Sequence, residues 1–270
     1  MPMSPSTDQL IQTIILGLIQ GLTEWFPISS TAHLRIVEHF LHYTATPLFN
    51  VTLHAGTLVA VMFYFRNDLV SMLSTLARWD FSSEYGRWIP LMLAAMVPTA
   101  IIGLVYVTFL EESLQTILMI GVTLVVGAGI VYVSRFGEES VGFMTFPTAI
   151  VAGLAQGFAV FPGLSRSGVV ISSLLLLGLS KEKAFKFSFL LSIPAIFGDL
   201  IVEAYIRRGQ FLTQEVGSLN VLVGLTLAMV TGYFAIRIVA RLVTTKRFFY
   251  FAFYTSSLGM ALILLSLAGF

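Results

Sequence analysis

Six long, almost uncharged apolar runs limit what this chain can fold into more than any other feature. A helix needs about 20 mostly apolar residues to cross a bilayer. Hydrophobic residues make up 57% of the 270-residue chain and charged residues only 11%, whereas a soluble domain usually carries about 25% charged residues. We therefore predict an all-α, polytopic membrane protein with six transmembrane helices. The runs are Phe49–Phe65, Trp88–Leu110, Leu114–Ser134, Ala184–Ile206, Leu219–Val239 and Phe248–Ala268.

Two further apolar stretches are interrupted by polar residues in their middle. Leu10–Leu41 is broken at residues 27–31, which read Pro-Ile-Ser-Ser-Thr, and Pro147–Leu179 is broken at residues 162–167, which read Pro-Gly-Leu-Ser-Arg-Ser. A polar loop at mid-membrane depth is stable only where protein or a water-filled cavity surrounds it. We therefore predict that both stretches form re-entrant helix–loop–helix hairpins.

The basic residues predict an orientation for these segments. If each hairpin returns to the side from which it entered, Arg207 and Arg208 fall on one side of the membrane, and Arg35 and Arg166 lie in the broken segments. The remaining basic residues share the other side, which the positive-inside rule makes cytoplasmic. We expect a multi-pass protein of the plasma membrane. The residues on the cytoplasmic side are Arg66, Arg78, Arg87, Arg135, Lys181, Lys183, Lys186, Arg237, Arg241, Lys246 and Arg247.

A short motif occurs twice, 136 residues apart. Gly-Leu-Ile-Gln-Gly-Leu at residues 17–22 recurs as Gly-Leu-Ala-Gln-Gly-Phe at residues 153–158, and each copy leads to Phe-Pro and then to serines. Each half then holds one hairpin and three spans, and an odd number of spans gives the halves opposite orientations. We predict one membrane domain built as an inverted repeat, over about residues 10–134 and 146–270. In transporters this architecture places the site where the broken helices meet.

The first broken segment carries polar residues suited to phosphate chemistry. Gln20 and Glu24 are four residues apart and share a helix face, and a serine at the helix start after Pro27 can cap it. A hydroxyl near a histidine is an arrangement that activates a nucleophile, and a carboxylate can orient that histidine or hold a divalent cation. The candidate residues are Gln20, Glu24, Ser29, Ser30, Thr31 and His33.

The second broken segment offers Ser165, Arg166 and Ser167 directly after a Pro-Gly pair. An arginine at mid-membrane is expensive and is by default a functional hypothesis, and its planar guanidinium matches a pair of phosphate oxygens. The structural alternative for Arg166 is a salt bridge to Glu24, which would also join the two hairpins. Together the segments supply a nucleophile, a base, a carboxylate and a phosphate clamp, a set that fits phosphoryl transfer.

Other polar residues in the apolar runs have blander explanations. A histidine in an apolar run, such as His54, is more often hydrogen-bonded within the protein core than catalytic. We expect Asp199 and Glu203 to face water near a cavity. The net charge of +1 gives no case for a nucleic-acid partner, and the absence of cysteine excludes disulfides and cysteine ligands.

The two broken segments resemble the signatures of a known family. Gln20–Glu24 followed by Pro27–His33 resembles the first signature of the undecaprenyl-diphosphate phosphatases, the bacitracin-resistance protein family, and Pro162–Gly168 is similar to the second. The resemblance covers essentially the whole chain. It implies hydrolysis of a polyprenyl diphosphate to the monophosphate lipid carrier at an extracytoplasmic site, with a divalent cation such as Mg²⁺ or Ca²⁺ held mainly by Glu24. A homodimer is compatible with this interpretation.

The resemblance implies functional roles for Glu24, Ser30, His33 and the second-segment residues, and it leaves the nucleophile open. In one hypothesis Ser30 attacks the terminal phosphorus with help from His33, while Gln20, Ser29, Thr31, Ser165, Arg166 and Ser167 bind phosphate. In the other, His33 or Glu24 activates water and Ser30 is only a ligand. A function of another class is also open, because an inverted repeat suits a flippase for a polyprenyl phosphate.

Overall fold

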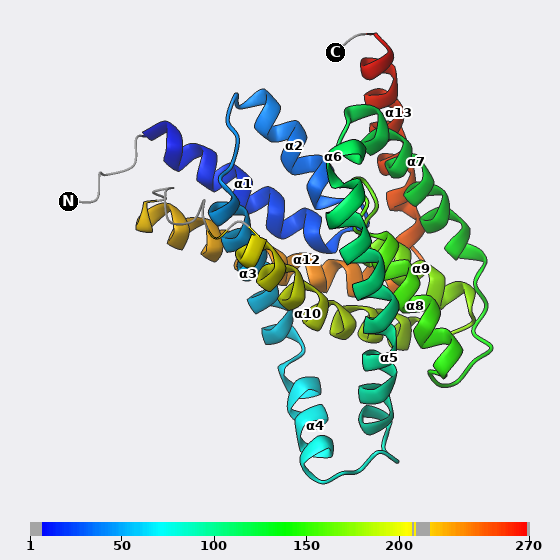
Figure 1. Ribbon diagram of the computed structural model, residues 1–270. Helices are drawn as coiled ribbons and strands as arrows, with labels where there is room; N and C mark the ends of the chain where they lie inside the picture. The colour runs from blue at the N-terminus through cyan, green and yellow to red at the C-terminus, as the bar shows by residue number, and fades with distance from the viewer. Residues whose placement is uncertain (1–6, 207, 209–216, 269–270) are drawn as a thin grey trace.

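The computed structural model describes residues 7–206, 208 and 217–268, and these residues fold almost entirely into helices (Figure 1). Arg207, part of the charge argument above, and residues 209–216, 269 and 270 of the second repeat lie outside the described residues. Six helical segments are long and apolar enough to cross a membrane, which confirms the six predicted runs. They are α3 (Pro47–Tyr64), α5 (Glu84–Val105) with η1 (Tyr106–Leu110), α7 (Ile117–Val133) with η2 (Ser134–Phe136), α10 (Lys181–Ile206), α12 (Ser218–Thr244), and η3 (Phe248–Tyr250) with α13 (Phe251–Leu267).

The outer faces of these segments need a lipid environment. In the most apolar 18-residue window of Glu84–Leu110, only 11% of the residues are buried within the protein. Leu93, Ile101 and Phe109 on this segment are 65%, 58% and 75% exposed. Apolar surface of this extent is stable next to acyl chains and unstable in water. The protein is therefore a multi-pass membrane protein.

Both interrupted stretches form two helices joined by a short loop. The first consists of α1 (Thr7–Trp25) and α2 (Ser30–Phe40), and the second of α8 (Phe146–Phe158) and α9 (Arg166–Leu176). A serine caps each second helix, because its side-chain oxygen accepts a hydrogen bond from the backbone N–H three residues ahead. The breaks thus lie where the prolines and serines predicted them.

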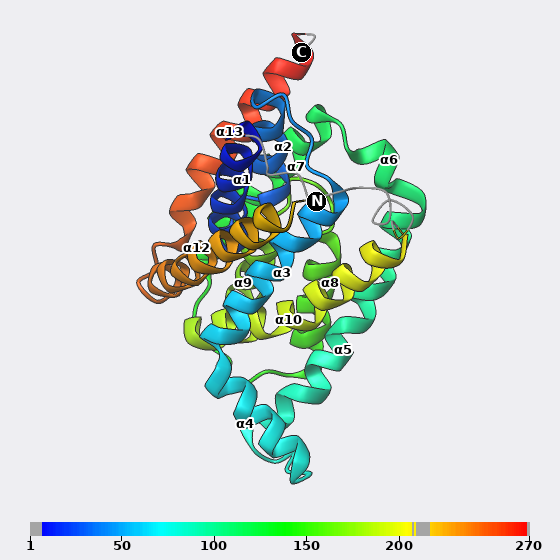
Figure 2. The same cartoon turned by 90° about the vertical axis from the view of Figure 1, so that its left-hand side faces the viewer.

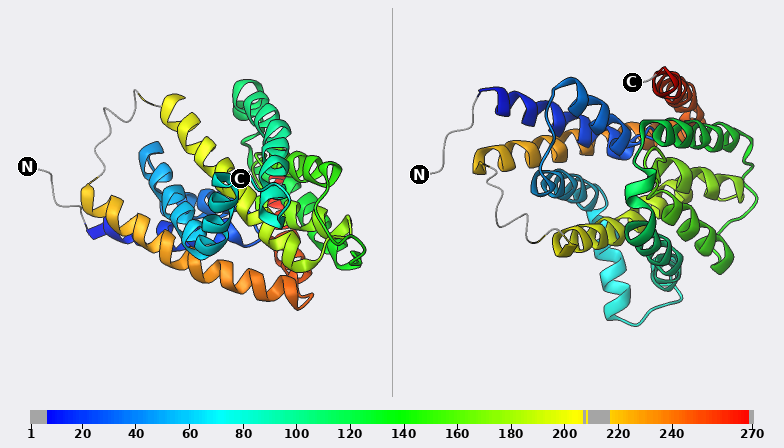
Figure 3. Two further views of the ribbon diagram at one scale, coloured as in Figure 1. Left: turned by 90° about the horizontal axis from the view of Figure 1, so that it is seen from below. Right: turned by 45° about the horizontal axis from the view of Figure 1, so that its top comes forward.

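Glycines in the repeated motif allow pairs of helices to approach closely. The α1 helix packs along α12 and α8 packs along α5, while α7 and α13 lie side by side (Figures 1, 2 and 3). A Cβ added at Gly21 would lie 2.6 Å from the carbonyl oxygen of Ala228, and one added at Gly153 would lie 2.1 Å from that of Ala95. Small residues at such contacts let membrane helices pack backbone to backbone.

Two short helices, α4 and α6, were not predicted from the sequence. The α4 helix (Arg66–Ala77) directly follows α3 and lies with the start of α5 at one end of the molecule, opposite α6 (Glu111–Leu114) and the C-terminal end of α13 (Figures 1 and 2). Lys186 of α10 holds α4 through an ion pair of 2.7 Å with Asp68. The apolar-run criterion missed α4 because polar and charged residues interrupt its apolar positions.

Candidate active site

The loops of the two broken segments touch each other near the middle of the molecule. The hydroxyl of Ser165 donates to the carbonyl oxygen of Phe26 at 3.2 Å, and the hydroxyl of Ser167 donates to that of Trp25 at 2.9 Å. These bonds join residues about 140 positions apart in the sequence, so the fold brings together the two motifs that the sequence singled out. The predicted meeting of the two loops is confirmed.

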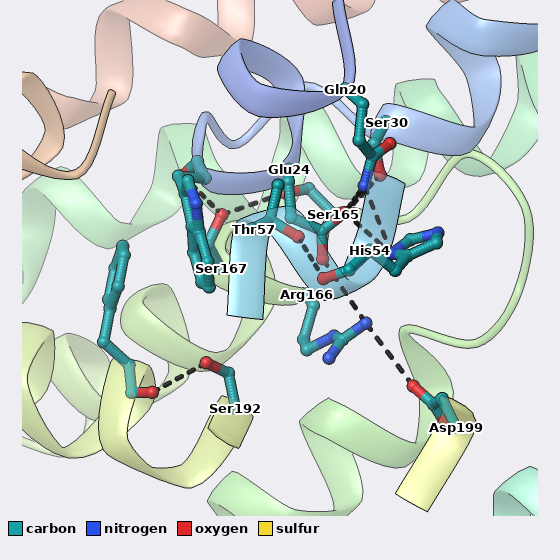
Figure 4. Close-up of polar contacts among 12 residues, drawn as sticks. Gln20, Glu24, Ser30, His54, Thr57, Ser165, Arg166, Ser167, Ser192 and Asp199 are labelled. Atoms are coloured by element: carbon teal, nitrogen blue, oxygen red, sulfur yellow. Dashed lines mark hydrogen bonds and ion pairs between the residues drawn. The ribbon is translucent and has the colours of Figure 1, made fainter. Parts of the chain in front are cut away.

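Glu24 is the centre of the polar cluster at this junction (Figure 4). Its side chain is buried, and its Oε2 accepts hydrogen bonds from Ser30 Oγ at 2.7 Å and Gln20 Nε2 at 3.1 Å. Its Oε1 lies 3.5 Å from Nη2 of Arg166, and its Oε2 lies 3.8 Å from Nδ1 of His54. The i, i+4 pairing of Gln20 with Glu24 is as the sequence indicated, and the salt bridge to Arg166 is the structural alternative that the sequence analysis gave for this arginine.

Arg166 is the first residue of α9 and links Glu24 to the opposite wall of the site. Its Nη2 also lies 3.6 Å from a carboxylate oxygen of Asp199 on α10. Its Nη1 is buried and has no hydrogen-bond partner among the described residues. A buried guanidinium nitrogen without an acceptor is costly, so the arrangement leaves a donor free for an anion. A small pocket beside Arg166 is lined by Glu24, Trp25, Ser167, Ser188, Phe189 and Ser192.

Ser30 and His33 have different partners from the ones the sequence suggested. The Ser30 hydroxyl donates to Glu24, and it comes from the first residue of α2. The ring of His33 turns the other way, with Nδ1 2.8 Å from the carbonyl oxygen of Ser29 and Nε2 2.7 Å from the hydroxyl of Tyr254 on α13. The structure therefore presents the carboxylate, and not the imidazole, to the Ser30 hydroxyl.

The remaining predicted phosphate-binding residues divide into buried and exposed groups. Ser29 and Ser165 are the buried N-caps of α2 and α9, and the hydroxyls of Ser165 and Ser167 lie 3.2 Å apart. Thr31 is exposed on the first turn of α2. Two capped helix starts meeting at one place direct backbone N–H groups towards the same region, which favours anion binding.

Sequence reasoning passed over His54 as a site residue. It comes from α3, one-third of its side chain is exposed, and its Nδ1 lies 3.1 Å from Gln20 Nε2 as well as near Glu24. Its position in an apolar run could have identified it, because an ionisable side chain inside a membrane segment is by default expected to be functional.

The comparisons with known proteins show the family to which the chain belongs. The family described as bacitracin resistance protein BacA matches residues 13–261. This chain belongs to that family. A relative named undecaprenyl-diphosphatase from Korarchaeum cryptofilum is 36% identical over 265 residues, covering 94% of this chain and 98% of the relative. Relatives of the same name from Carboxydothermus hydrogenoformans and Syntrophotalea carbinolica are 34% and 38% identical and cover 96% and 92% of this chain, and 98% and 96% of their own length.

The oxygen atoms of this BacA-family site suit a hard divalent cation that binds with a phosphate ligand. Within the described part of the chain, no three His, Asp or Glu side chains converge into a protein-only metal site. Mg²⁺ is usually held by one or two carboxylates together with substrate phosphates. Glu24 supplies the carboxylate, and the amide oxygen of Gln20 is buried and has no hydrogen-bond partner in the part of the chain that the structure describes. These two groups fit such a cation.

Proposed function

We propose that this chain hydrolyses undecaprenyl diphosphate to undecaprenyl monophosphate and inorganic phosphate. The observation that carries the proposal is the contact of a buried carboxylate with a serine hydroxyl and an arginine drawn from two distant parts of the chain: Glu24, Ser30 and Arg166. The names of full-length relatives at 34–38% identity point to the same substrate. The diphosphate head binds where the two loops meet, and the lipid tail lies among the surrounding helices.

The diphosphate is held mainly by Arg166 and the two helix starts. The buried Nη1 of Arg166 donates to an oxygen of the terminal phosphate, which removes the cost of an unpaired donor. Backbone N–H groups in the first turns of α2 and α9 complete the anion site. Asp199 pairs with the same Nη2 that faces Glu24 and so helps to orient the guanidinium. Positioning and charge stabilisation of this kind account for most of the rate gain in phosphoryl transfer.

Ser30 is the nucleophile, and Glu24 is the group that takes its proton. The Ser30 oxygen forms a bond to the terminal phosphorus, the bond from that phosphorus to the bridging oxygen breaks, and the polyprenyl monophosphate leaves. Water then attacks the phosphoserine, inorganic phosphate leaves, and Ser30 recovers a proton. The 2.7 Å hydrogen bond from Ser30 Oγ to Glu24 Oε2 supports this assignment over one in which His33 is the base.

A divalent cation, Mg²⁺ or Ca²⁺, is part of the proposal. Glu24 and Gln20 would hold it together with the substrate, and when bound it supplies positive charge against the phosphate oxygens.

The two broken segments are proposed to be re-entrant hairpins of an inverted repeat. The shift of 136 residues that relates the two motifs also relates α2, residues 30–40, to α9, residues 166–176. In an inverted repeat α1 is equivalent to α8, and α5 is equivalent to α12. The α1 helix packs on α12 and α8 packs on α5, so the two contacts are equivalent as well. The charge distribution supports an extracytoplasmic site.

Phosphate release by purified protein tests the function. Wild-type protein in detergent is given undecaprenyl diphosphate, undecaprenyl monophosphate and a shorter polyprenyl diphosphate, with and without a chelator. We expect release from diphosphates only, and loss of release with chelator. Movement of lipid across sealed vesicles without phosphate release would instead support a flippase.

The nucleophile is tested separately by trapping. A phosphoserine at Ser30 after rapid acid quench is the expected result, and Ser30→Ala should abolish both the trapped species and phosphate release. Ser256→Ala is the matched control, because the Ser256 hydroxyl donates to a backbone carbonyl of its own helix, that of Phe253, and to nothing else among the described residues. Near-normal phosphate release by the Ser30→Ala protein would show that water, and not Ser30, attacks the phosphorus.

A further inference from the structure

Two carboxylates share one nitrogen of Arg166 (Figure 4). Its Nη2 lies 3.5 Å from Oε1 of Glu24 and 3.6 Å from Oδ2 of Asp199, which comes from α10. Two negative charges thus face one positive charge, and these three side chains together carry one net negative charge. A phosphate group that approaches Arg166 has the same sign and is repelled by both carboxylates. Binding of phosphate to this arginine is therefore opposed by groups of the protein itself.

The geometry of the guanidinium indicates which contact a phosphate would replace. Nη1 of Arg166 is buried and has no hydrogen-bond partner among the described residues, so it is available to one phosphate oxygen. Arginine commonly binds phosphate through two parallel N–H···O bonds, and Nη1 forms such a pair together with Nη2. The partners that Nη2 has in this structure are Glu24 and Asp199. A phosphate bound through both nitrogens therefore competes with one of these carboxylates.

Asp199 is the carboxylate that can give way. The exposed fraction of the side chain is 69% for Asp199, 22% for Arg166 and 5% for Glu24. Glu24 also accepts hydrogen bonds from Ser30 and Gln20, whereas Arg166 is the only hydrogen-bond or ion-pair partner of Asp199 in the described part of the chain. An exposed ion pair contributes little in water, while a buried charge that loses its partner is costly. The contact with Asp199 is therefore the weaker of the two.

Asp199 lies where the packed face of α10 opens to the outside. Ser192 and Ile196 precede it on the same face of the helix and are buried. Phe197 and Ile201 lie on another face and are exposed, which marks the side that faces lipid. The exposed carboxylate of Asp199 contacts Arg166 and does not belong to that side. It therefore borders the opening through which a charged headgroup would reach the site.

We infer that Asp199 competes with phosphate for Arg166: it holds the guanidinium in the free protein, gives up this contact when the diphosphate binds, and regains it when inorganic phosphate leaves. The inference deepens the proposed function, on which it rests for the identity of the phosphate ligand. Asp199 thereby lowers the affinity of the site for phosphate and favours release of the product. It tunes affinity and takes no part in the bonds that form and break.

The sign of the effect separates competition from a purely structural role. If Asp199 only oriented the guanidinium, its removal would leave Arg166 less ordered and would weaken the binding of phosphate. Competition predicts tighter binding when the carboxylate is removed, because one attractive partner of Arg166 and one negative charge are lost together. Asp199→Asn tests this with almost no change in the volume of the side chain.

Inhibition by inorganic phosphate is the primary measurement, with full-length protein in detergent and undecaprenyl diphosphate as substrate. We expect Asp199→Asn to lower the inhibition constant of phosphate and the KM for the lipid by about threefold to tenfold, without an increase in kcat. Asp199→Glu keeps a carboxylate and should stay closer to the wild type. Glu203→Gln removes the same charge one helical turn further along α10 and should change either constant by less than about twofold. An unchanged or higher inhibition constant in Asp199→Asn, or an equal decrease in Glu203→Gln, would overturn the inference.

Binding of inorganic phosphate without lipid distinguishes a failure of this inference from a failure of the proposed reaction. The rise in the unfolding temperature with phosphate concentration reports the affinity, and Asp199→Asn should reach half of the rise at about threefold to tenfold lower phosphate. Asp199→Ser replaces Asp199→Asn if size exclusion shows that the latter does not fold. If phosphate binding tightens in the variant while no phosphate is released from the lipid, the proposed reaction fails and the competition stands. If the lipid is hydrolysed and phosphate binding does not tighten, the competition alone fails.

Discussion

The two helix–loop–helix segments share a framework and differ in their chemistry. In both, a serine caps the second helix, and the first residue of that helix projects into the site: Ser30 in α2 and Arg166 in α9. At this equivalent position the first segment has a hydroxyl beside the carboxylate of Glu24, and the second has a guanidinium. The cluster at the junction contains both charges, and neither segment could form it alone. The glycines and capping serines that the two segments share build the framework, and the residues that differ, Ser30 with Glu24 in one segment and Arg166 in the other, form the polar cluster.

The largest expected effect comes from the carboxylate that only the first segment carries. Glu24→Gln removes the charge that faces Arg166 and His54 and replaces the carboxylate that can take a proton from Ser30 with an amide that cannot, so kcat/KM for phosphate release should fall by about 10³-fold or more. Steady-state release from undecaprenyl diphosphate is the measurement. Val160→Ala, at the equivalent place in the second segment, should change it by less than about threefold. Comparable losses in the two variants would mean that the segments are chemically equivalent.

A smaller loss is expected from the clamp in the second segment. Arg166→Lys keeps the positive charge but loses the second guanidinium nitrogen, Nη1, which is buried and has no hydrogen-bond partner among the described residues. We expect kcat/KM to fall by about 10²-fold. The same substitution at Arg35, which bonds to the backbone and side chain of Gln115 outside the site, should have little effect on kcat. A fully active Arg166→Lys enzyme would show that charge without geometry suffices.

The sequence was sufficient for those parts of the fold that depend on local patterns. Apolar length predicted the six spans, and Pro and Ser predicted the two breaks, because both act within a few residues of themselves. The pairing of Gln20 with Glu24 follows from helical spacing alone, and the cost of burying Arg166 required a partner such as Glu24.

The contacts of His54, His33 and Tyr254 could not be found in this way. They depend on how α1, α2, α3 and α13 pack against one another, and spacing along the chain contains no information about that packing. The Ser30–His33 spacing was compatible with a hydrogen bond, but the side chains turn to Glu24 and Tyr254 instead.

Helix packing offers a test of the shared framework. A Cβ at Gly153 would lie 2.1 Å from the carbonyl oxygen of Ala95, whereas at the equivalent Gly17 the nearest atoms are 3.1 Å away. Because backbone atoms cannot yield as a side chain can, Gly153→Ala should lower the free energy of unfolding by about 1–3 kcal/mol and Gly17→Ala by less. Thermal or chemical unfolding in detergent measures both. Equal destabilisation would show that α1 and α8 are held equally tightly, contrary to the structure.

The smallest expected effect concerns the base that activates Ser30. Tyr254→Phe removes the hydroxyl 2.7 Å from His33 Nε2 while keeping the ring that stacks on the imidazole, with centroids 5.7 Å apart. A neutral hydrogen bond of this kind contributes about 0.5–1.5 kcal/mol. If Glu24 takes the proton of Ser30, that loss is confined to the orientation of His33, and kcat should stay within about threefold of wild type. A fall of more than about tenfold in kcat, with KM unchanged and the fold intact, would place His33 on the reaction path. The asymmetry between the segments would then extend to α13, because the second half of the chain would supply the residue that orients the base of the first.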